Sequence, residues 1–460
     1  MKTVIKDLPY EQVLALKPEK SRKPLKPGIF WRTLMRVLSR GELKEAGFRA
    51  TYTGMEKLGR KEPCLILMNH SCFTDLLIAQ TVFADRPMNI VCTSDGFVGK
   101  RWLMRRLGCI PTHKFVTDFV LVRNMKYAIE KLRCSVLMYP EASYSFDGTA
   151  TPLPDTLGKC LKLLGVPVVL VRTYGAFAHD PLYNNLQKRR VSIRADVQYL
   201  LSPQEIQEKS VAELNGILKK AFTFDNWQWQ RENNVRITEP FRADFLNRVL
   251  YTCCNCGCEG NMRGKGTRLT CGACGAVWEL TELGTLEKVA PQENAGTAES
   301  PAPYAQTGPQ AASPALRPPH SFRSVPEWFA WQRELVRQEI ACGSYSISVP
   351  VEIYLMVNTK AIYHVGDGIL SHSAAGFVLD GCGGKLHYEQ GPRASYSLYS
   401  DYYWYEIGDM ICIGTMKILY YCIPKQPGDI VAKARIATEE LYRLCGDRSQ
   451  KLSNRTDRQD

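Results

Sequence analysis

The chain has 460 residues, too many for one hydrophobic core, so we expect several domains. Its 45% hydrophobic and 23% charged residues are typical of a folded globular protein and exclude a wholly disordered chain. A formal net charge of +13 favours an anionic partner, and nucleic acid, phosphorylated small molecules or an acidic membrane would each satisfy it.

Compartment and membrane topology follow from the apolar runs and the cysteines. No stretch approaches the 18 to 20 uninterrupted apolar residues of a spanning helix, and residues 1–19 carry charges where a signal peptide needs an apolar core. The 17 cysteines are an odd number, scattered through expected strands and helices rather than set in a small disulfide framework. We therefore expect a protein of the reducing cytoplasm that neither spans a membrane nor is exported.

Residues 1–45 are predicted to form a basic arm and an amphipathic helix. Residues 1–28 are basic and proline-containing, which indicates a mostly irregular arm. From Ile29 apolar residues alternate with Arg32, Arg36 and Arg40, whose four-residue spacing places the arginines on one stripe of a helix. Two interpretations stay open at this point. The helix could lie in a membrane interface, or it could be an ordinary surface helix packed on its own domain.

Residues 46–250 alternate strand and helix patterns, which predicts an α/β domain with a largely buried sheet. The expected strands are Cys64–Met68, Asn89–Cys92, Ser135–Tyr139, Val166–Arg172 and Val191–Tyr199. The expected helices are Asp75–Phe83, Lys100–Leu107, Met125–Leu132 and Asp155–Leu164. Ser202-Pro203-Gln204-Glu205 is a capping box with proline at the first helical position, so a further helix should run from there toward Lys220.

The remainder divides by composition into four segments. Residues 251–287 are rich in cysteine, 288–325 are a flexible linker rich in proline and alanine, 326–446 form a second large domain, and 447–460 are a disordered tail. In the large domain a helix over Glu327–Ala341 precedes many strands, and a helix over Asp429–Leu444 closes the fold. The expected strands are Tyr345–Val357, Ala361–Val365, Gly376–Leu379, Leu386–Tyr388, Tyr402–Ile407, Met410–Ile413 and Ile418–Cys422, with turns at Gly366–Gly368 and Gly381–Gly384. This order predicts an antiparallel, barrel-like sheet capped by a helix.

Four short blocks with chemical character follow one another in the α/β segment. They are Asn69-His70-Ser71-Cys72-Phe73-Thr74-Asp75, Gly108-Cys109-Ile110-Pro111-Thr112-His113-Lys114, Tyr139-Pro140-Glu141-Ala142-Ser143-Tyr144-Ser145 and Val166-Pro167-Val168-Val169-Leu170-Val171. In the first block an apolar run is followed by a histidine and, five residues later, by an aspartate at an expected helix start. This is the arrangement that a general base with an orienting carboxylate requires. Taken alone, this spacing is equally that of a loop histidine and a helix-capping aspartate.

The order of the four blocks resembles that of the glycerolipid acyltransferase family, most closely the lysophosphatidic acid (1-acylglycerol-3-phosphate) acyltransferases. The resemblance covers roughly residues 45 to 225 and implies a reaction. His70 would remove the proton from a glycerol hydroxyl as that oxygen attacks the thioester of an acyl donor, while Asp75 orients His70. Because the attacking oxygen belongs to the substrate, Ser71 and Cys72 would be structural rather than nucleophilic.

The third block, residues 139–145, departs from the family pattern Phe-Pro-Glu-Gly-Thr-Arg-Ser. Ala142 replaces glycine, and Tyr144 replaces the arginine thought to hold the acceptor phosphate; tyrosine offers one neutral donor where arginine offers a charged fork. By the resemblance, Glu141, Ser143 and Tyr144 bind the acceptor, although Glu141 could instead cap the turn after its strand. Lys114 and Lys100 are the basic residues expected to compensate, with Arg101, Arg105, Arg106 and Arg123 as further candidates.

Two Cys-x-x-Cys-Gly knuckles stand in residues 251–287, with fourteen residues between them. Cys253, Cys256, Cys271 and Cys274 suit tetrahedral zinc, and the pattern resembles a zinc ribbon. Four protein ligands leave no open position, so the zinc would be structural. Cys254 and Cys258 are spare, and a redox pair or reduced buried thiols are the alternative reading of the knuckles.

The prediction for the whole chain is a multidomain acyltransferase of phospholipid synthesis. Its donor would be acyl-CoA or acyl carrier protein, its acceptor a lysophospholipid, and its place the inner face of the cell membrane, bound peripherally through the basic surface. The C-terminal strands and closing helix resemble a pleckstrin-homology-like module, and the aromatic run around Tyr402–Tyr405 fits a strand face or barrel core. We do not expect a nucleic-acid partner. The rival hypothesis is a catalytically degenerate module that binds lipid or protein through the ribbon and the C-terminal domain.

Overall fold

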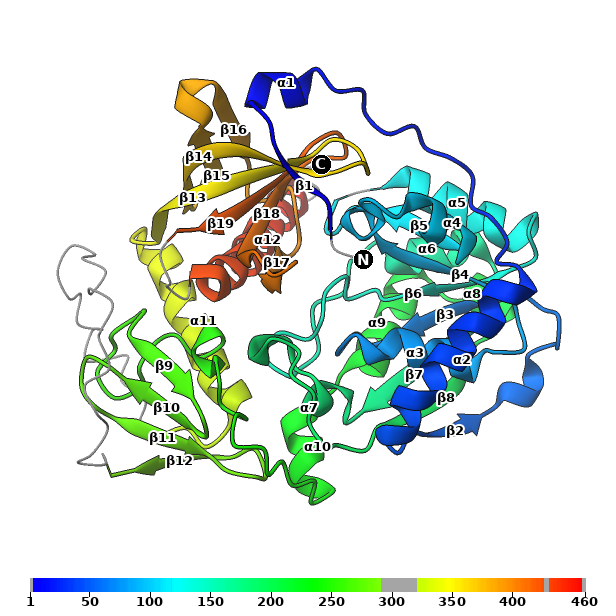
Figure 1. The fold of residues 1–460 in the computed structure, drawn as a ribbon, viewed down its shortest axis with the longest axis horizontal. Helices are drawn as coiled ribbons and strands as arrows, with labels where there is room; N and C mark the ends of the chain where they lie inside the picture. The colour runs from blue at the N-terminus through cyan, green and yellow to red at the C-terminus, as the bar shows by residue number, and fades with distance from the viewer. Residues whose placement is uncertain (1–2, 117, 291–320, 426–429, 457–460) are drawn as a thin grey trace.

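The computed structural model describes residues 3–116, 118–290, 321–425 and 430–456. Three bodies are visible: an α/β domain, a small four-stranded sheet, and a C-terminal domain with a large sheet and two helices (Figure 1). The predicted fold class is therefore confirmed.

The α/β domain is built on a mixed seven-stranded sheet in the order β2-β8-β7-β3-β6-β4-β5. The strands are β2 (Arg49–Thr53), β3 (Leu65–Met68), β4 (Met88–Thr93), β5 (Cys109–Thr112), β6 (Ser135–Met138), β7 (Val168–Tyr174) and β8 (Arg194–Leu201). Only the β7–β8 pair of this sheet is antiparallel. The sequence predicted five of these strands; β2 and the proline-containing β5 were missed.

Both faces of this sheet are covered, because successive residues of β3 point into different cores. Leu65 and Leu67 lie in one core cluster, and Ile66 and Met68 in another, all fully buried. The helices are α2 (Ile29–Glu45), α3 (Thr74–Val82), α4 (Arg101–Arg106), α5 (Phe119–Glu130), α6 (Leu157–Leu164), α7 (Ala176–His179), α8 (Pro203–Glu208), α9 (Val211–Phe222) and α10 (Asn226–Glu232). The predicted capping box at Ser202 is present, but the helix expected to run toward Lys220 is divided into α8 and α9, because a second capping box at Ser210 begins a new helix.

The N-terminal arm is more ordered than its composition indicated. Strand β1 (Ile5–Asp7) pairs in parallel with β14 (Ile362–Ser373) of the C-terminal sheet, and α1 (Tyr10–Leu14) follows it. The arm then crosses to the α/β domain, where α2 begins (Figure 1). A short edge strand of this kind has no local signal, because its partner lies more than 350 residues away in the sequence.

The cysteine-rich segment forms an antiparallel sheet of β9 (Met262–Lys265), β10 (Arg268–Cys271), β11 (Val277–Leu280) and β12 (Leu286–Val289). Trp278 of β11 is fully buried and contacts Trp328 of α11 (Val325–Cys342), with 4.9 Å between ring centroids. The ribbon therefore shares its core with the first helix of the C-terminal domain.

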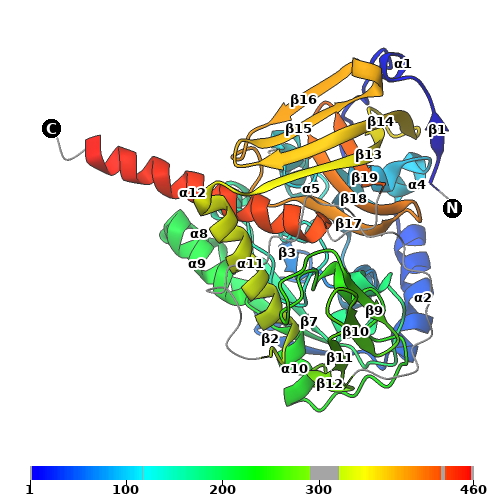
Figure 2. The ribbon, with the colours of Figure 1, turned by 90° about the vertical axis from the view of Figure 1, so that its left-hand side faces the viewer.

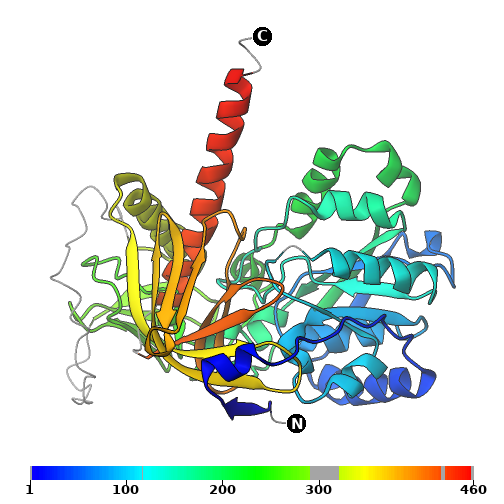
Figure 3. The same ribbon diagram turned by 90° about the horizontal axis from the view of Figure 1, so that it is seen from above.

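The C-terminal domain has an antiparallel sheet in the order β16-β15-β14-β13-β19-β18-β17, and α11 packs against α12 (Figure 2). Its strands are β13 (Ser346–Met356), β14 (Ile362–Ser373), β15 (Gly376–Gly381), β16 (Leu386–Gln390), β17 (Tyr399–Trp404), β18 (Gly408–Gly414) and β19 (Leu419–Pro424). Its helices are α11 (Val325–Cys342) and α12 (Ile430–Thr456). The end of α12 projects beyond the rest of the molecule (Figure 3).

Three expectations for this region differ from the structure. The turn expected at Gly366–Gly368 lies inside β14, where the register with β13 shifts in a β-bulge, a usual place for glycine. The strand expected at Tyr402–Ile407 is β17 and ends at Trp404, because Tyr405 and Glu406 have positive φ. Helix α12 runs beyond Leu444, through residues expected to be a disordered tail. Most of the expected linker, residues 291–320, lies outside the described residues.

Candidate active site

The first block lies where β3 ends and α3 begins. His70 follows the last residue of β3 by two positions, and Asp75 stands in the first turn of α3. The carboxyl end of a central parallel strand is the usual place for a binding site in an α/β sheet. The short loop between the two elements is what brings both side chains to this edge.

His70 and Asp75 contact each other through their side chains. His70 Nδ1 lies 3.0 Å from Asp75 Oδ2, and the same oxygen accepts the backbone N–H groups of Ser71 at 2.7 Å and Cys72 at 3.0 Å. An oxygen that accepts two amide hydrogens is held as an acceptor, so Nδ1 of His70 is the donor in the third contact. This leaves Nε2 of neutral His70 with its lone pair available to take a proton.

Burial controls the charge on His70. Its side chain is 19% exposed and that of Asp75 is fully buried. Burial lowers the pKa of His70 below its ordinary value, while the hydrogen bond and charge of Asp75 oppose this shift and the charge of Lys114 adds to it. The imidazole is therefore neutral near pH 7, which is the form a general base needs.

Glu141 of the third block braces the His70 loop. Its carboxylate accepts the backbone N–H of His70 at 2.8 Å on one oxygen and that of Thr151 at 2.9 Å on the other. Glu141 is only 2% exposed, and burial raises the pKa of its carboxyl to about 7. Both oxygens of Glu141 thus bind backbone amides of other segments, and its predicted role in acceptor binding stays a prediction.

Two tyrosines enclose the imidazole. The Tyr139 ring stacks on His70 with 4.0 Å between centroids, and the tilted Tyr144 ring lies at 4.3 Å. Tyr144, which occupies the position of the family's arginine, is therefore next to the candidate base. It presents an aromatic ring there instead of a positive charge.

Ala142 adopts a backbone conformation that suits the glycine it replaces. Its φ is 57°, in the left-handed region where a Cβ costs roughly 1–2 kcal/mol. The third block therefore places an alanine at a backbone position that favours glycine.

We expect Ala142→Gly to raise the free energy of unfolding by about 1 kcal/mol, because the relief at positive φ exceeds the added freedom of the unfolded chain. Urea denaturation followed by circular dichroism would measure it. Ala128→Gly, in the interior of α5, is the matched control and should destabilise instead. A loss of stability in both variants would contradict this account of Ala142.

Of the basic residues expected to replace the missing arginine, only Lys114 lies near the site. Its ammonium sits over the ring of Tyr399, 4.2 Å from the centroid, and its charge acts on His70. Lys100 precedes α4, and no contact within the described chain joins its side chain to His70, Asp75 or Glu141. Other candidates are engaged elsewhere or exposed: Arg101 with Glu19, Arg105 with Lys23 O, Arg106 over Trp102, and Arg123 at the surface of α5.

The C-terminal domain docks on this face of the α/β domain, which sequence reasoning did not foresee. Asp95, 3% exposed after β4, accepts hydrogen bonds from Tyr399 Oη at 2.6 Å and Trp404 Nε1 at 3.2 Å. Arg435 of α12 donates to Ser143 Oγ at 3.1 Å. The aromatic run expected on a strand face or in a barrel core lies on β17 and also forms part of a domain interface, and a third-block residue contacts a helix 292 positions away.

The four ribbon cysteines converge. Their sulfur atoms all lie within 4.8 Å of one another, with Sγ–Sγ distances of 3.7 Å for Cys253–Cys274 and 3.8 Å for Cys256–Cys271. A tetrahedron with Zn–S bonds of about 2.3 Å has edges of about 3.8 Å, so the thiols have the spacing of a four-sulfur metal site. Cys254 and Cys258 are not in this cluster.

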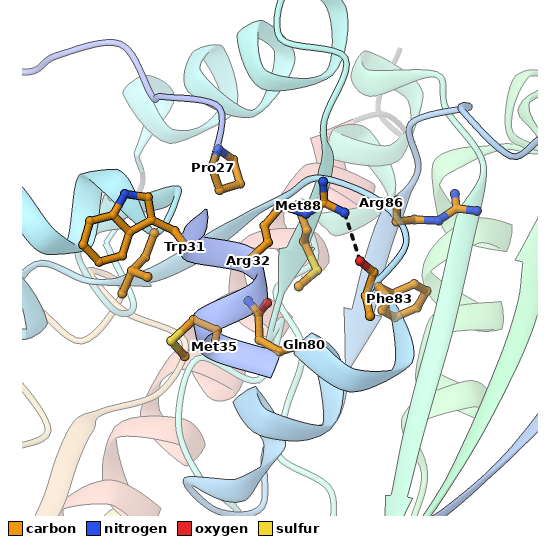
Figure 4. A pocket seen from close by; sticks show the side chains of 10 residues that line it. Pro27, Trp31, Arg32, Met35, Gln80, Phe83, Arg86 and Met88 are labelled. Carbon is orange, nitrogen blue, oxygen red and sulfur yellow. Dashed lines mark hydrogen bonds between the residues drawn. The ribbon is translucent and has the colours of Figure 1, made fainter. Parts of the chain in front are cut away.

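A separate small pocket lies between α2 and α3, away from His70 (Figure 4). Its lining includes Trp31, Met35, Phe83 and Met88, and its free volume is about 10 Å³, about what one water molecule needs. Arg32 points into this region and donates to Ala84 O at 2.9 Å. At least one arginine of the predicted basic stripe therefore faces the protein.

The matches to known proteins cover only part of the chain. An acyltransferase family model matches residues 49–172, which include His70, Asp75 and Glu141. Among solved structures, the 1-acyl-sn-glycerophosphate (LPA) acyltransferase PlsC from Thermotoga maritima is matched at 17% identity over 42% of this chain and 76% of that chain, with a TM-score of 0.32. No curated protein matches the chain. The family match shows that residues 49–172 belong to an acyltransferase-family domain.

Proposed function

We propose that the protein transfers a fatty acyl group from a thioester donor, acyl-CoA or acyl carrier protein, to the hydroxyl of a lysophosphatidic acid or related lysophospholipid. The observation that carries this proposal is the contact between His70 Nδ1 and Asp75 Oδ2 within an acyltransferase-family domain. That contact leaves Nε2 as the base for an alcohol.

In the proposed reaction His70 Nε2 removes the acceptor hydroxyl proton as the oxygen attacks the thioester carbonyl. The tetrahedral intermediate then collapses, the C–S bond breaks, and the imidazolium returns its proton to the thiolate. Asp75 stabilises the imidazolium between these steps, and the N–H groups of Ser71 and Cys72 hold the carboxylate in place. Glu141 positions the backbone of His70.

An acyl-enzyme on the neighbouring thiol has no support. Cys72 is fully buried, and burial raises the pKa of its thiol well above the usual value, with Asp75 adding to the shift. The thiolate is the nucleophilic form of cysteine, so this side chain is inert at neutral pH. Direct attack by the acceptor hydroxyl is the chemistry that we propose.

Incubation of the purified protein with labelled acyl-CoA or acyl-loaded carrier protein and a panel of lysophospholipids tests the function. Label should move to at least one acceptor, and the assay should report which head group is used. Failure to turn over any combination, with lipid still bound, would instead support the catalytically degenerate binding module.

We further propose that the protein acts at a membrane surface on the cytoplasmic side. No described helix is long and apolar enough to span a bilayer. However, Phe30 and Val37, seven residues apart on one face of α2, are 68% and 52% exposed, and Trp102 of α4 is 64% exposed. Exposed apolar groups near basic residues are typical of interfacial helices, and the 17 free thiols suit a reducing compartment.

The double substitution Phe30→Glu and Val37→Glu should weaken binding to vesicles of phosphatidylglycerol and phosphatidylcholine by more than about 10-fold, since each apolar side chain contributes roughly 1.5–3 kcal/mol when buried. Vesicle co-sedimentation measures this. Ile369→Glu, at an exposed apolar position of β14, should bind like the wild type. Equal binding by all three proteins would show that α2 is not the membrane-contacting helix.

A structural zinc ion completes the proposal. Cys253, Cys256, Cys271 and Cys274 would hold it as thiolates. Bound there, zinc would crosslink the two knuckles and supply no catalysis, since four sulfur ligands leave no position for water or substrate.

A further inference from the structure

The acyltransferase-family domain lacks a guanidinium in its third block. Tyr144 stands at the family's arginine position, 4.3 Å from the His70 ring. Of the basic residues expected to compensate, Arg101 and Arg105 contact the N-terminal arm and Arg106 stacks on Trp102. These three guanidinium groups are therefore engaged away from the third block.

Helix α12 brings a guanidinium to this place from the C-terminal domain. Arg435 Nη2 donates to Ser143 Oγ at 3.1 Å, one residue before Tyr144. The guanidinium carbon lies 4.9 Å from the centroid of Phe146, on the other side of Tyr144 in the sequence. Arg435 therefore spans the segment in which the family carries its own arginine.

Arg435 is buried with donor capacity to spare. The residue is 3% exposed, and its Nη1 is buried without a hydrogen-bond partner among the described residues. A buried, unsatisfied donor of a charged group costs free energy, and such groups normally have a partner or a ligand. An anion at Nη1 would satisfy it.

Glu439, the carboxylate paired with Arg435, is shared with other groups. Glu439 Oε1 lies 3.4 Å from Arg435 Nε, but Glu439 also pairs with Arg333 at 2.7 Å and accepts from Ser397 Oγ at 2.6 Å. Two guanidinium groups thus share one carboxylate on this side, although Arg333 contacts Glu440 as well. Glu141 of the third block also interacts electrostatically with Arg435, but Nη1 of Arg435 remains without a hydrogen-bond partner among the described residues.

We propose that Arg435, from the C-terminal domain of the same chain, supplies the guanidinium that the third block lacks. It binds the phosphate of the lysophosphatidic acid acceptor beside His70. Lys114 joins it, and its position also depends on the C-terminal domain through Tyr399. The C-terminal domain is then part of the acceptor site. This inference rests on the proposed function and assigns its specificity to a residue outside the acyltransferase-family domain.

Kinetics with two acceptors isolate the phosphate contact. Arg435→Gln should lower kcat/KM for lysophosphatidic acid by about 10- to 100-fold, chiefly through KM, because one charge-assisted contact is lost. For monoacylglycerol, which lacks the phosphate, kcat/KM should change less than about 2-fold. An equal loss with both acceptors would overturn the proposal.

Two further variants separate binding from folding. Arg443→Gln removes an exposed guanidinium of the same helix, paired with Glu440, without touching Ser143, and should leave the preference for the phosphorylated acceptor unchanged. Tyr144→Arg in the Arg435→Gln background returns a guanidinium to the family position and should restore at least part of the lost kcat/KM. If Arg435→Gln does not fold, Arg435→Lys, which keeps the charge without the fork, should raise KM for lysophosphatidic acid; an unchanged KM would refute the proposal.

Binding of glycerol 3-phosphate, measured by calorimetry on the full chain, does not require turnover. The wild type should bind it and Arg435→Gln should bind it about 10-fold or more weakly. Arginine-dependent binding without acyl transfer to any acceptor would mean that the proposed function fails while the subsite stands. Acyl transfer that is insensitive to position 435, with no binding difference, would mean the reverse.

Discussion

Replacing His70 with alanine should lower kcat/KM for acyl transfer by about 100- to 10,000-fold, the range that a positioned general base contributes. The imidazole is the group next to the third block whose free nitrogen can accept a proton at neutral pH, since its other nitrogen is bound to Asp75. Steady-state assays with labelled donor measure the loss. The matched control is His387→Ala, which removes an exposed histidine paired with Asp380 at 2.6 Å in the C-terminal domain and should leave the rate unchanged.

The isosteric change Asp75→Asn tests the same centre through the charge next to His70. Asparagine can keep a carbonyl oxygen where Oδ2 now accepts all three N–H groups, so the tautomer of His70 is retained while the negative charge that stabilises the imidazolium is removed. We expect a loss of about 10- to 1,000-fold in kcat with little change in stability. A loss below about 10-fold would show that Asp75 serves only to cap α3.

The pH dependence of kcat/KM tests the protonation state of His70 independently. A base is active above its pKa, and burial places the pKa of His70 below the ordinary 6.5, so the acid limb of kcat/KM should lie below pH 6.5. In the wild type Asp75 raises that pKa against the effect of burial, so residual activity in Asp75→Asn should have its acid limb at a still lower pH. A limb above pH 6.5 would contradict a buried, neutral base.

Contacts between residues close in sequence were predictable here. His70 and Asp75 are five residues apart across a tight strand-to-helix loop, and each Cys-x-x-Cys knuckle is a local turn, so the side chains within each motif lie together, although the spacing alone did not decide their role. The strands of the buried sheet were equally legible, because a run such as Leu65–Met68 is apolar on both faces. Local pattern and final structure agree where the element is decided by its own residues.

Contacts between distant segments were not predictable from pattern. The basic residues near the second block were the natural substitutes for the missing arginine, yet the N-terminal arm engages Arg101 and Arg105, and Arg435 arrives from 292 residues beyond Ser143. The aromatic run gave the same difficulty, since Tyr399 and Trp404 bind Asp95 of another domain. A single sequence does not indicate which domain surfaces contact each other, because an apolar or aromatic run is equally typical of a domain interface and of a domain core.

Removing the proposed zinc ion should unfold the ribbon. Zinc bound by four thiolates contributes roughly 10 kcal/mol or more of binding free energy, comparable with the whole stability of an ordinary domain, so the ribbon should unfold without it. Cys271→Ser should lose the metal, with elemental analysis falling from one zinc per chain to none. Hydrogen exchange in β10 and β11 should become fast. Cys258→Ser, which changes a thiol outside the cluster, should keep the zinc and the protection.

The loss should extend to acyl transfer through α11. Trp328 of this helix packs on Trp278 of the ribbon and donates to Thr252 O at 2.9 Å, while Arg333, one and a half turns further on, binds Glu439 and Glu440 of α12. Unfolding the ribbon removes one side of this connection, and α12 carries Arg435 to the third block. We therefore expect Cys271→Ser to raise KM for lysophosphatidic acid more than for monoacylglycerol, because the phosphate contact depends on the placement of α12. A metal-free protein with unchanged KM for both acceptors would show that the ribbon does not support the acceptor site.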